Sequence, residues 1–232
     1  MSKTIIVVGF GPGISTGVAE KFGAEGFNVA LIGRSQERLD AGAAALKAKG
    51  ITAAAFTADA SDPANIRAAI GKVRAQFGSI NAVHWNAYGG FEGGDLVTAN
   101  DAAIRGVFDV AISGLLATVQ EALPDLKAAG DGALLVTNGA FADLNPQIDE
   151  YAVTGKSMGV ALANAAKHKL VGLLVVRLKS ENVYVGEVMI AGSVKGTAWA
   201  ANDPKAIDPA DVGAKFFELY KNRGDNYARL PS

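Results

Sequence analysis

The sequence predicts a doubly wound α/β domain, with a parallel sheet of about seven strands and helices on both faces. Three observations carry this prediction. Short apolar runs of β-type residues alternate along the 232 residues with amphipathic stretches of helical spacing. The apolar runs are nearly continuous, as in parallel strands that are buried on both faces. A glycine-rich segment directly follows the first run.

Strands and helices are expected in alternation along the chain. The expected strands cover residues 5–8, 28–32, 52–57, 80–85, 133–137 and 183–190. The expected helices cover residues 16–25 and 35–49, a stretch that begins at 61, residues 101–126, a long helix that ends near 181, and a last helix from 208. Because parallel strands are joined by right-handed crossovers, this order produces one sheet covered on both sides. No linker, repeat or low-complexity segment divides the chain, so we expect one domain over residues 1–232.

Composition excludes several classes of protein. The chain has 22 basic and 23 acidic side chains, a formal net charge of -1 and no cysteine, and half of its residues are hydrophobic. Disorder, a disulfide scaffold and a general nucleic-acid binder are therefore excluded. The two histidines stand apart from any carboxylate cluster, so no metal site is expected. No signal peptide and no unbroken apolar stretch of roughly 18–20 residues is found, so we expect a cytoplasmic protein without a membrane partner.

The segment 9–17 after the first strand, here called the glycine loop, has the composition of a pyrophosphate-binding turn. It reads Gly9-Phe10-Gly11-Pro12-Gly13-Ile14-Ser15-Thr16-Gly17. Glycines let the backbone turn sharply and approach a phosphate, and the following helix offers free N–H groups and the positive end of its dipole. The alternative is a tight turn that binds nothing. Three glycines in five residues after a buried first strand favour the dinucleotide site.

With this loop the chain resembles the short-chain dehydrogenase/reductase family over essentially its whole length. Gly9 and Gly13 fit the first two glycines of the family's Gly-x-x-x-Gly-x-Gly loop, and Ser15 stands at the third. Three further matches follow in order, Asp59-Ala60 beside the adenine, Asn86-Ala87 after the fourth strand, and residues 191–197 at the family's Pro-Gly-x-x-x-Thr. The resemblance implies a single Rossmann-type domain, an oxidoreductase acting on a small molecule, and a homodimer or homotetramer built on the two long helices. The cofactor site that it implies contains Gly9, Gly11, Pro12, Gly13, Ile14, Ser15, Arg34, Ser35, Asp59, Ala60, Asn86, Ala87, Lys167, Gly192, Val194 and Thr197.

The end of the second strand predicts NADP, with NADPH preferred over NADH. NAD-binding relatives carry a carboxylate there that accepts hydrogen bonds from the ribose 2′-OH, and this position is Gly33. The next residue, Arg34, can bind a 2′-phosphate through two parallel hydrogen bonds, and Ser35 can add a hydroxyl. Arg38 lies one helical turn further along. The alternative is that Arg34 is a solvated loop charge.

The catalytic set that the resemblance implies is altered in this chain. The family uses a Tyr as proton donor, a Lys four residues later that lowers its pKa and holds the nicotinamide ribose, a Ser that polarises the carbonyl, and an Asn on the fourth helix. The Asn position is Ala111, and the Ser position holds Asn138 or Gly139. Asn138 is able to donate a hydrogen bond to a substrate oxygen, or it is a turn residue at a strand end.

Two registers compete for the Tyr and the Lys. Tyr151 lies 13 residues after Asn138, as the family Tyr usually does, but Gly155 then takes the Lys position. Counted backward from the sixth strand, the lysine is Lys167 and the Tyr position is Ala163. A lysine at 156 would leave ~12 Å of helix beyond the sheet, which favours Lys167. Residues 140–162 then form an enlarged segment on the substrate side, from which Tyr151 reaches the site or has no role in it.

The sequence therefore predicts an NADPH-dependent oxidoreductase that transfers hydride to a small, fairly apolar carbonyl, imine or activated alkene. The predicted catalytic residues are Lys167, Tyr151 and Asn138, with a water as an alternative proton donor to Tyr151. The alternative function is an NADP-binding sensor or scaffold that catalyses nothing. Aromatic residues that follow strand ends favour an apolar substrate, and loop packing is their other explanation; they are Trp85, Tyr88, Phe91, Phe141 and Trp199.

Overall fold

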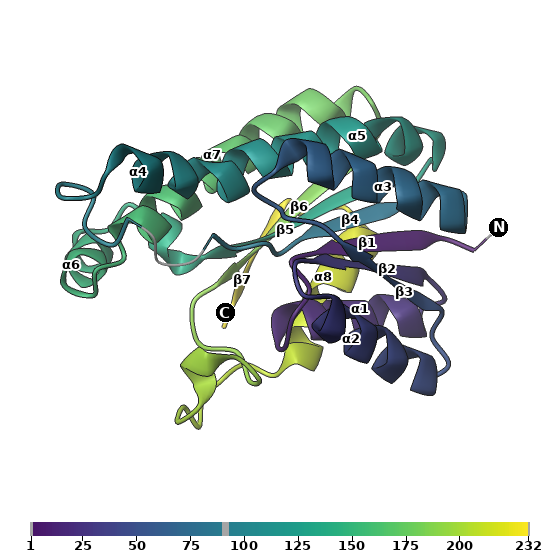
Figure 1. Cartoon of the computed structure of the whole chain (residues 1–232), viewed down its shortest axis with the longest axis horizontal. Coiled ribbons are helices and arrows are strands. Elements are labelled where there is room, and N and C mark those ends of the chain that lie inside the picture. The colour runs from purple at the N-terminus through teal and green to yellow at the C-terminus, as the bar shows by residue number, and fades with distance from the viewer. Residues whose placement is uncertain (1, 90–92, 232) are drawn as a thin grey trace.

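The computed structural model describes residues 2–89 and 93–231 and contains one parallel sheet of seven strands in the order β3-β2-β1-β4-β5-β6-β7 (Figure 1). The strands are β1 (Thr4–Val8), β2 (Asn28–Gly33), β3 (Ala53–Thr57), β4 (Ala82–Trp85), β5 (Ala133–Gly139), β6 (Tyr184–Ile190) and β7 (Tyr227–Leu230). The predicted fold class is confirmed. The seventh strand, which the sequence analysis did not locate, pairs parallel to β6 and forms one edge of the sheet.

Helices cover both faces of the sheet. α1, α2 and α8 lie on one face, and α3, the helix formed by α4 and α5, and α7 lie on the other (Figure 1). Their bounds are α1 (Ile14–Ala24), α2 (Gln36–Ala48), α3 (Pro63–Phe77), α4 (Asp101–Phe108), α5 (Leu115–Ala128), α6 (Pro146–Thr154), α7 (Met158–Lys179) and α8 (Pro209–Asn222). The chain crosses from β3 at one edge to β4 beside β1, so the winding direction reverses between β1 and β4.

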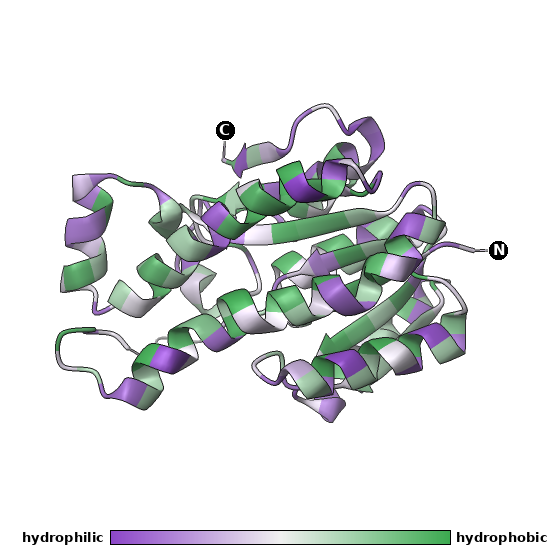
Figure 2. Cartoon of the chain, turned by 90° about the horizontal axis from the view of Figure 1, so that it is seen from above, coloured by the Kyte–Doolittle hydropathy of each residue, from purple (hydrophilic) through white to green (hydrophobic). Residues whose placement is uncertain are grey.

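The sheet separates two hydrophobic cores. Residues of β1 alternate between them, because successive side chains of a strand point to opposite faces. Ile6 and Val8 belong to the core under α3, α5 and α7, whereas Ile5 and Val7 belong to the core under α1, α2 and α8. In Figure 2 the central strands are accordingly coloured mostly as hydrophobic, whereas the helices carry both hydrophilic and hydrophobic residues.

Several helices begin at the side chains that the sequence indicates. Asp62 caps α3 by accepting hydrogen bonds from the backbone N–H groups of Ala64 and Asn65, with Pro63 as the first helical residue. Asp208 caps α8 in the same way, and Pro209 again follows. Caps of this kind satisfy N–H groups that have no partner within the helix.

The fourth helix, expected as one stretch over 101–126, is interrupted. Residues Asp109–Gly114 form a π-helical segment, η1, between α4 and α5. A Cβ atom on Gly114 would lie 1.9 Å from the carbonyl oxygen of Ala60, so this glycine allows the helix to approach the loop after β3. Such π-bulges occur frequently at functional sites. Ala111, at the family's Asn position, is buried within this segment.

Residues 140–162, expected as an enlarged segment, contain the short 3-10 turn η2 (Ala140–Ala142), α6 and the first turn of α7. α6 stands beyond the sheet at one end of the molecule (Figure 1). Two helical stretches, Asp101–Ala128 and Met158–Lys179, are long and apolar enough to cross a membrane by length and composition alone. Both pack on the same face of the sheet, and core helices of globular proteins satisfy the same criteria.

The contact between α1 and α8 depends on paired glycines. A Cβ atom on Gly17 would lie 1.9 Å from the carbonyl oxygen of Pro209, and one on Gly213 would lie 2.3 Å from the carbonyl oxygen of Gly17. No side chain can occupy either position without moving a helix backbone. α1 begins at the glycine loop, so this contact also positions the loop.

We therefore expect Gly17→Ala to lower the free energy of unfolding by about 2–4 kcal/mol, because overpacking against backbone strains both helices. Denaturant unfolding followed by circular dichroism measures this change. The matched control is Gly71→Ala in α3, where nothing lies within 4 Å of the added Cβ. That variant should gain up to ~1 kcal/mol from helix propensity. Equal effects of the two substitutions would contradict the proposed packing.

Candidate active site

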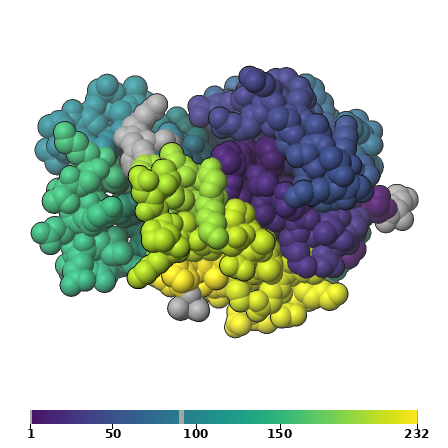
Figure 3. Space-filling model, turned by 90° about the horizontal axis from the view of Figure 1, so that it is seen from below, coloured from purple at the N-terminus to yellow at the C-terminus, as the bar shows by residue number. Residues whose placement is uncertain are grey.

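A cleft of about 730 Å³ lies along the carboxyl ends of β1 to β4, at the point where the winding direction reverses. Its walls are the loops that follow these strands, together with residues from α4 and η1. Figure 3 shows a recess between the N-terminal part of the chain, in purple and blue, and the yellow-green segment that follows β6. In open α/β sheets, ligands bind in this position.

The glycine loop forms one wall of the cleft. Gly9 has a φ of 80° in the left-handed region, and a Cβ atom there would lie 2.5 Å from the backbone nitrogen of Ala87. Gly13 has a φ of 86°, and a Cβ atom added there would lie 2.7 Å from the Thr197 side chain. Both positions therefore require glycine. These contacts are within the protein, and the predicted approach of the loop backbone to a pyrophosphate stays a prediction.

Ser15 stands where the family loop has its third glycine, and it is fully buried. Its hydroxyl donates to the carbonyl oxygen of Gly11 and accepts from the Gly11 N–H, both at 2.9 Å. The Thr16 hydroxyl donates to the same carbonyl oxygen at 2.9 Å. These bonds fix the loop against the first turn of α1, so the serine stabilises the loop rather than disrupting it.

The far end of the cleft is basic. Arg34, Ser35 and Arg38 line it beside the end of β2. The Ser35 hydroxyl caps α2 by accepting from the Arg38 N–H at 3.3 Å, and the Arg38 guanidinium lies close to Gly11. Hydrogen bonds from Ser61 hold the pKa of Asp59 below its ordinary value, with a smaller contribution from the charge of Arg34. Arg34, Ser35 and Arg38 together offer two cations and a hydroxyl to an anionic group.

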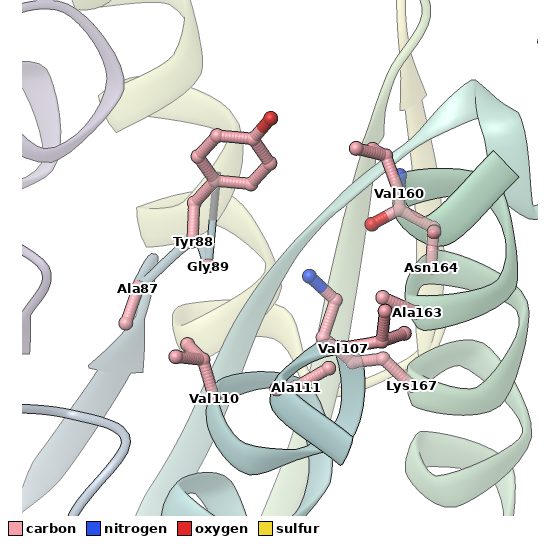
Figure 4. Close-up of a pocket in the computed structure, with 12 residues that line it drawn as sticks. Ala87, Tyr88, Gly89, Val107, Val110, Ala111, Val160, Ala163, Asn164 and Lys167 are labelled. Atoms are coloured by element: carbon pink, nitrogen blue, oxygen red, sulfur yellow. The ribbon is translucent and has the colours of Figure 1, made fainter. Parts of the chain in front are cut away.

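A smaller pocket of about 30 Å³ continues from the cleft between η1 and α7, and Lys167 is at its base. The Nζ of Lys167 points into the space between Tyr88 and Asn164 (Figure 4). Lys167 is only 8% exposed, and no hydrogen bond or ion pair of its amine is found among the described residues. Burial lowers the pKa of Lys167 to about 8, partly offset by the negative charge of Glu187.

Behind Lys167 lies a buried polar cluster centred on Glu187 of β6, which is 1% exposed. One carboxylate oxygen accepts from Asn138 Nδ2 at 2.7 Å, and the other pairs with His168 Nδ1 at 2.5 Å. Asn138 Nδ2 also donates to the Asn164 carbonyl oxygen at 3.0 Å, and its Oδ1 accepts from the Gly139 N–H at 3.0 Å. The cluster joins β5, β6 and α7 beneath the pocket.

Most of the predicted cofactor residues lie together around the cleft. Those that line it are Gly9, Gly11, Pro12, Ser15, Arg34, Ser35, Asp59, Ala60, Asn86 and Ala87. Gly13 and Ile14 begin α1 behind this wall. Of the segment after β6, Thr197 packs on Gly13, and its hydroxyl donates to the Val194 carbonyl oxygen at 2.7 Å. Gly192, at the start of the segment, contacts Ile207 and Pro231 rather than the glycine loop.

Of the three predicted catalytic residues, one lines the pocket and two lie elsewhere. Lys167 lines the pocket, as the register counted backward from β6 requires. Tyr151 lies on α6 with 68% of its surface exposed, stacked on Phe141 at a ring-centroid distance of 5.9 Å. It is not among the residues that line the pocket or the cleft. Asn138 is 2% exposed, and both of its N–H donors are engaged in the cluster beneath the pocket.

The aromatic residues do not form a substrate pocket together. Trp85 is fully buried in the core, and Trp199 is 64% exposed. Phe91 lies outside the described residues. Of the described members of the set, only Tyr88 lines the pocket and the cleft. The pocket walls are instead aliphatic, formed by Val107, Val110, Ala111, Val160 and Ala163.

Sequence reasoning missed Glu187, and it named Tyr88 only as one of several aromatic residues that follow strand ends. The signal for Glu187 was a carboxylate within an otherwise apolar strand, all seven residues of which are buried. A charged side chain in such a strand requires partners, which points to a polar cluster. Tyr88 stands two residues after Asn86, within the matched segment, and burial raises its pKa to about 12. Among the described residues, no group of three or more metal-ligating side chains is found.

The reversal point, the glycine loop and the cleft have the arrangement of the dinucleotide-binding α/β fold. The short chain dehydrogenase family model matches residues 3–170, and the chain belongs to this family. The 3-oxoacyl-(acyl-carrier-protein) reductase FabG of Staphylococcus aureus is 28% identical over 172 residues, which cover 73% of this chain and 69% of that protein. The short-chain dehydrogenase/reductase SDRA of Arabidopsis thaliana is 27% identical over 168 residues, covering 71% and 65% of the two chains.

Solved structures share the fold at lower identity. The L-sorbose reductase of Gluconobacter frateurii, complexed with NADPH and L-sorbose, superposes with a TM-score of 0.84 and 19% identity, covering 99% of this chain and 95% of that one. The alcohol dehydrogenase of Thermococcus sibiricus, complexed with 5-hydroxy-NADP, has a TM-score of 0.80 and 21% identity over 98% and 95% of the chains.

The burial of Lys167 should affect the free energy of unfolding in a pH-dependent way. Its pKa is lower in the folded protein than in the unfolded chain, so the charged amine destabilises the fold below a pH of about 8. We expect Lys167→Met, which removes the charge at similar volume, to raise the free energy of unfolding at pH 7 by about 1–3 kcal/mol. The gain should shrink as pH rises from about 8 toward 10.5, because the wild-type amine then folds uncharged.

Denaturant unfolding at pH 7 and at pH 10 measures both effects. Lys169→Met, at an exposed neighbouring position of α7, is the control and should change stability by less than about 0.5 kcal/mol. A Lys167→Met protein that is less stable than wild type at pH 7 would show that the amine has a stabilising partner.

Proposed function

We propose that this protein is an NADPH-dependent oxidoreductase that transfers hydride to a small, fairly apolar carbonyl, imine or activated alkene. The observation that carries the proposal is a single continuous site, with a basic end at Arg34 and Arg38 and a buried amine, Lys167, at the other end. A charged amine without a partner in an aliphatic pocket is costly to keep, and such groups concentrate at functional sites.

The residues present fit a dinucleotide. The cleft volume lies within the range of cofactor sites. At Gly9 and Gly13 a Cβ atom would clash with Ala87 or Thr197, so the loop keeps its backbone bare beside the cleft. The glycine loop and the first turn of α1 would hold the pyrophosphate, Asp59 and Ala60 the adenine, and Asn86 and Ala87 the central part of the cofactor.

NADP is the proposed cofactor, with NADPH preferred over NADH. Arg34, Ser35 and Arg38 would bind the 2′-phosphate at the basic end of the cleft. The lack of a carboxylate at Gly33 removes repulsion against that phosphate. Solved relatives of the same fold are complexed with NADP or NADPH, which supports the same choice for this chain.

When bound, the cofactor would supply hydride from nicotinamide C4. Lys167 would hold the nicotinamide ribose through its N–H donors, and the aliphatic walls of the pocket would exclude water from the reacting carbon. Asn138 was predicted to orient the substrate, but its donors are engaged with Glu187 and Asn164. We propose instead that Asn138 positions α7 against β5. Tyr151 would reach the substrate only after a movement of α6.

A sensor or scaffold that binds NADP without catalysis is the second candidate function. The observation that favours it is the composition of the site, with Ala111 and Ala163 at two catalytic positions and Tyr151 exposed. A panel of carbonyl and imine substrates, benzaldehyde among them, separates the two candidates. Turnover of NADPH with any member supports the enzyme, and tight NADPH binding without turnover across the panel supports the sensor.

We also propose a cytoplasmic homo-oligomer, a dimer or tetramer. The support is the apolar outer face of α7, where Leu162, Leu173 and Val176 are exposed by 41%, 56% and 76%. A second copy would bury these side chains. Sedimentation velocity at micromolar concentration tests this, and a monomer at all concentrations would contradict it.

Arg34→Asp tests the cofactor preference. The substitution replaces the phosphate-binding cation with a carboxylate, so we expect the ratio of NADPH to NADH affinity to fall by at least 100-fold, about 3 kcal/mol. Fluorescence titration with each dinucleotide gives the ratio. Lys72→Asp makes the same type of charge change on the exposed face of α3 and should leave the ratio unchanged. A ratio that stays at the wild-type value in Arg34→Asp would refute the assignment of the 2′-phosphate site.

A further inference from the structure

The altered site lacks an evident proton donor at the family position. Ala163, one helical turn before Lys167, carries no proton to donate. Asn138 is bound to Glu187 and Asn164, and Tyr151 lies outside the pocket. A reduction needs a proton as well as a hydride, so another group that faces the pocket has to supply it.

Two titratable side chains line the pocket, Tyr88 and Lys167. Burial raises the pKa of Tyr88 to about 12, whereas burial lowers the pKa of Lys167 to about 8. The Lys167 ammonium is thus the stronger acid of the two, with a pKa near the operating pH where general acids are most effective. Its Nζ also points into the open space of the pocket (Figure 4).

Glu187 is placed to maintain the charge of this amine. It is held on both carboxylate oxygens, by Asn138 at 2.7 Å and by His168 at 2.5 Å. Its negative charge raises the pKa of Lys167 and so opposes the effect of burial. His168 has 43% of its side chain exposed, which connects the carboxylate to solvent. No ion pair joins Glu187 directly to Lys167 among the described residues, so the effect acts through space.

We propose that Lys167 is itself the proton donor of this site, and that Glu187 is the positioning residue that keeps the amine in its ammonium form. This inference rests on the proposed reductase function. The substrate carbonyl accepts hydride at carbon from the reduced dinucleotide and a proton at oxygen from Lys167 Nζ. The C=O π bond, one N–H bond of the ammonium and the C–H bond at nicotinamide C4 break, a C–H and an O–H bond form on the substrate, and the nicotinamide ring becomes the aromatic pyridinium. The carbonyl is reduced to an alcohol, the dinucleotide is oxidised, and the neutral amine regains a proton from water.

Among the described residues, few other charges lie on the elements that pack on α7. β6 contributes Glu187, η1 contributes the half-buried Asp109, and α4 contributes the exposed Asp101 and Arg105. β5 and η2 contribute no titratable side chain, and Tyr88 stands across the pocket. The titratable residues of α6 and the neighbours on α7 itself are Asp149, Glu150, Tyr151, His168 and Lys169. Glu187 is the most deeply buried charge of the set, so its removal is the sharpest test.

The first experiment needs no substrate or cofactor. In the full-length protein labelled with ¹³C at lysine Cε, a pH titration by NMR reports the ionisation of each lysine, and the spectrum of Lys167→Arg assigns the Lys167 signal. We expect Lys167 to titrate near pH 8. In Glu187→Gln the titration midpoint of Lys167 should fall further, because the opposing charge is lost.

A titration midpoint of Lys167 near pH 10.5 in the wild-type protein would overturn the proposal. A midpoint that is the same in wild type and in Glu187→Gln would also overturn it. If Glu187→Gln does not fold, the wild-type midpoint and the kinetic experiment below decide.

The second experiment separates proton donation from holding the ribose. Lys167→Arg retains a cation and several N–H donors, but a guanidinium does not release its proton near neutral pH. With NADPH and benzaldehyde, we expect the kcat of Lys167→Arg to fall by at least 100-fold while the Kd for NADPH changes by less than about tenfold. Lys169→Arg is the matched control and should retain both values. In wild type, kcat should be constant below pH 8 and fall above it.

The outcomes distinguish the proposal from the function on which it rests. A wild-type protein that does not bind NADPH contradicts the proposed function itself. NADPH binding and turnover that survive in Lys167→Arg show that the lysine only holds the ribose. A loss of kcat in Tyr151→Phe with activity retained in Lys167→Arg assigns the proton to Tyr151 and overturns the inference.

Discussion

An all-parallel sheet ends every strand at the same edge, and the rest of this molecule is arranged around that constraint. The strands are buried on both faces, so the space for a ligand lies beyond their carboxyl ends. The winding direction reverses between β1 and β4, which leaves room between the loops that follow them. The cleft and the pocket of Lys167 both lie there.

Close backbone packing then sets the shape of that edge. Gly9 approaches the backbone of Ala87, Gly114 approaches Ala60, and Gly17 approaches Pro209. At each contact, two backbone segments lie closer together than any side chain would permit. Several glycines of the chain therefore stand where such segments meet. The π-helical segment η1 belongs to the same arrangement, because Gly114 ends it.

The site is built at the expense of stability. Lys167 is buried among aliphatic side chains with no direct partner among the described residues, and Glu187 compensates for this only from a distance. The carboxylate is in turn held by Asn138 and His168. A fold selected for stability alone would place an apolar residue at this position of α7. Because packing does not explain a buried amine at this position, the presence of Lys167 supports a functional role for the pocket.

Much of this arrangement could be predicted from the sequence, since strand periodicity, the glycine loop and Arg34 are local signals. The location of Lys167 on the pocket wall could also be predicted, because the length of the helix before β6 is a physical constraint. The places of Tyr151 and Asn138 could not be predicted, since they depend on how α6 packs and on a partner, Glu187, that lies 49 residues from Asn138. The π-helical turn likewise depends on a tertiary contact, between Gly114 and Ala60.

The most direct test of the account is a crystal structure of the protein with NADP bound. We predict that the pyrophosphate lies on the glycine loop, that the 2′-phosphate contacts Arg34, and that Lys167 Nζ lies within hydrogen-bond distance, about 3 Å, of a nicotinamide ribose hydroxyl. A dinucleotide whose nicotinamide ring lies away from the pocket of Lys167, or a 2′-phosphate exposed to solvent away from Arg34, would contradict the account.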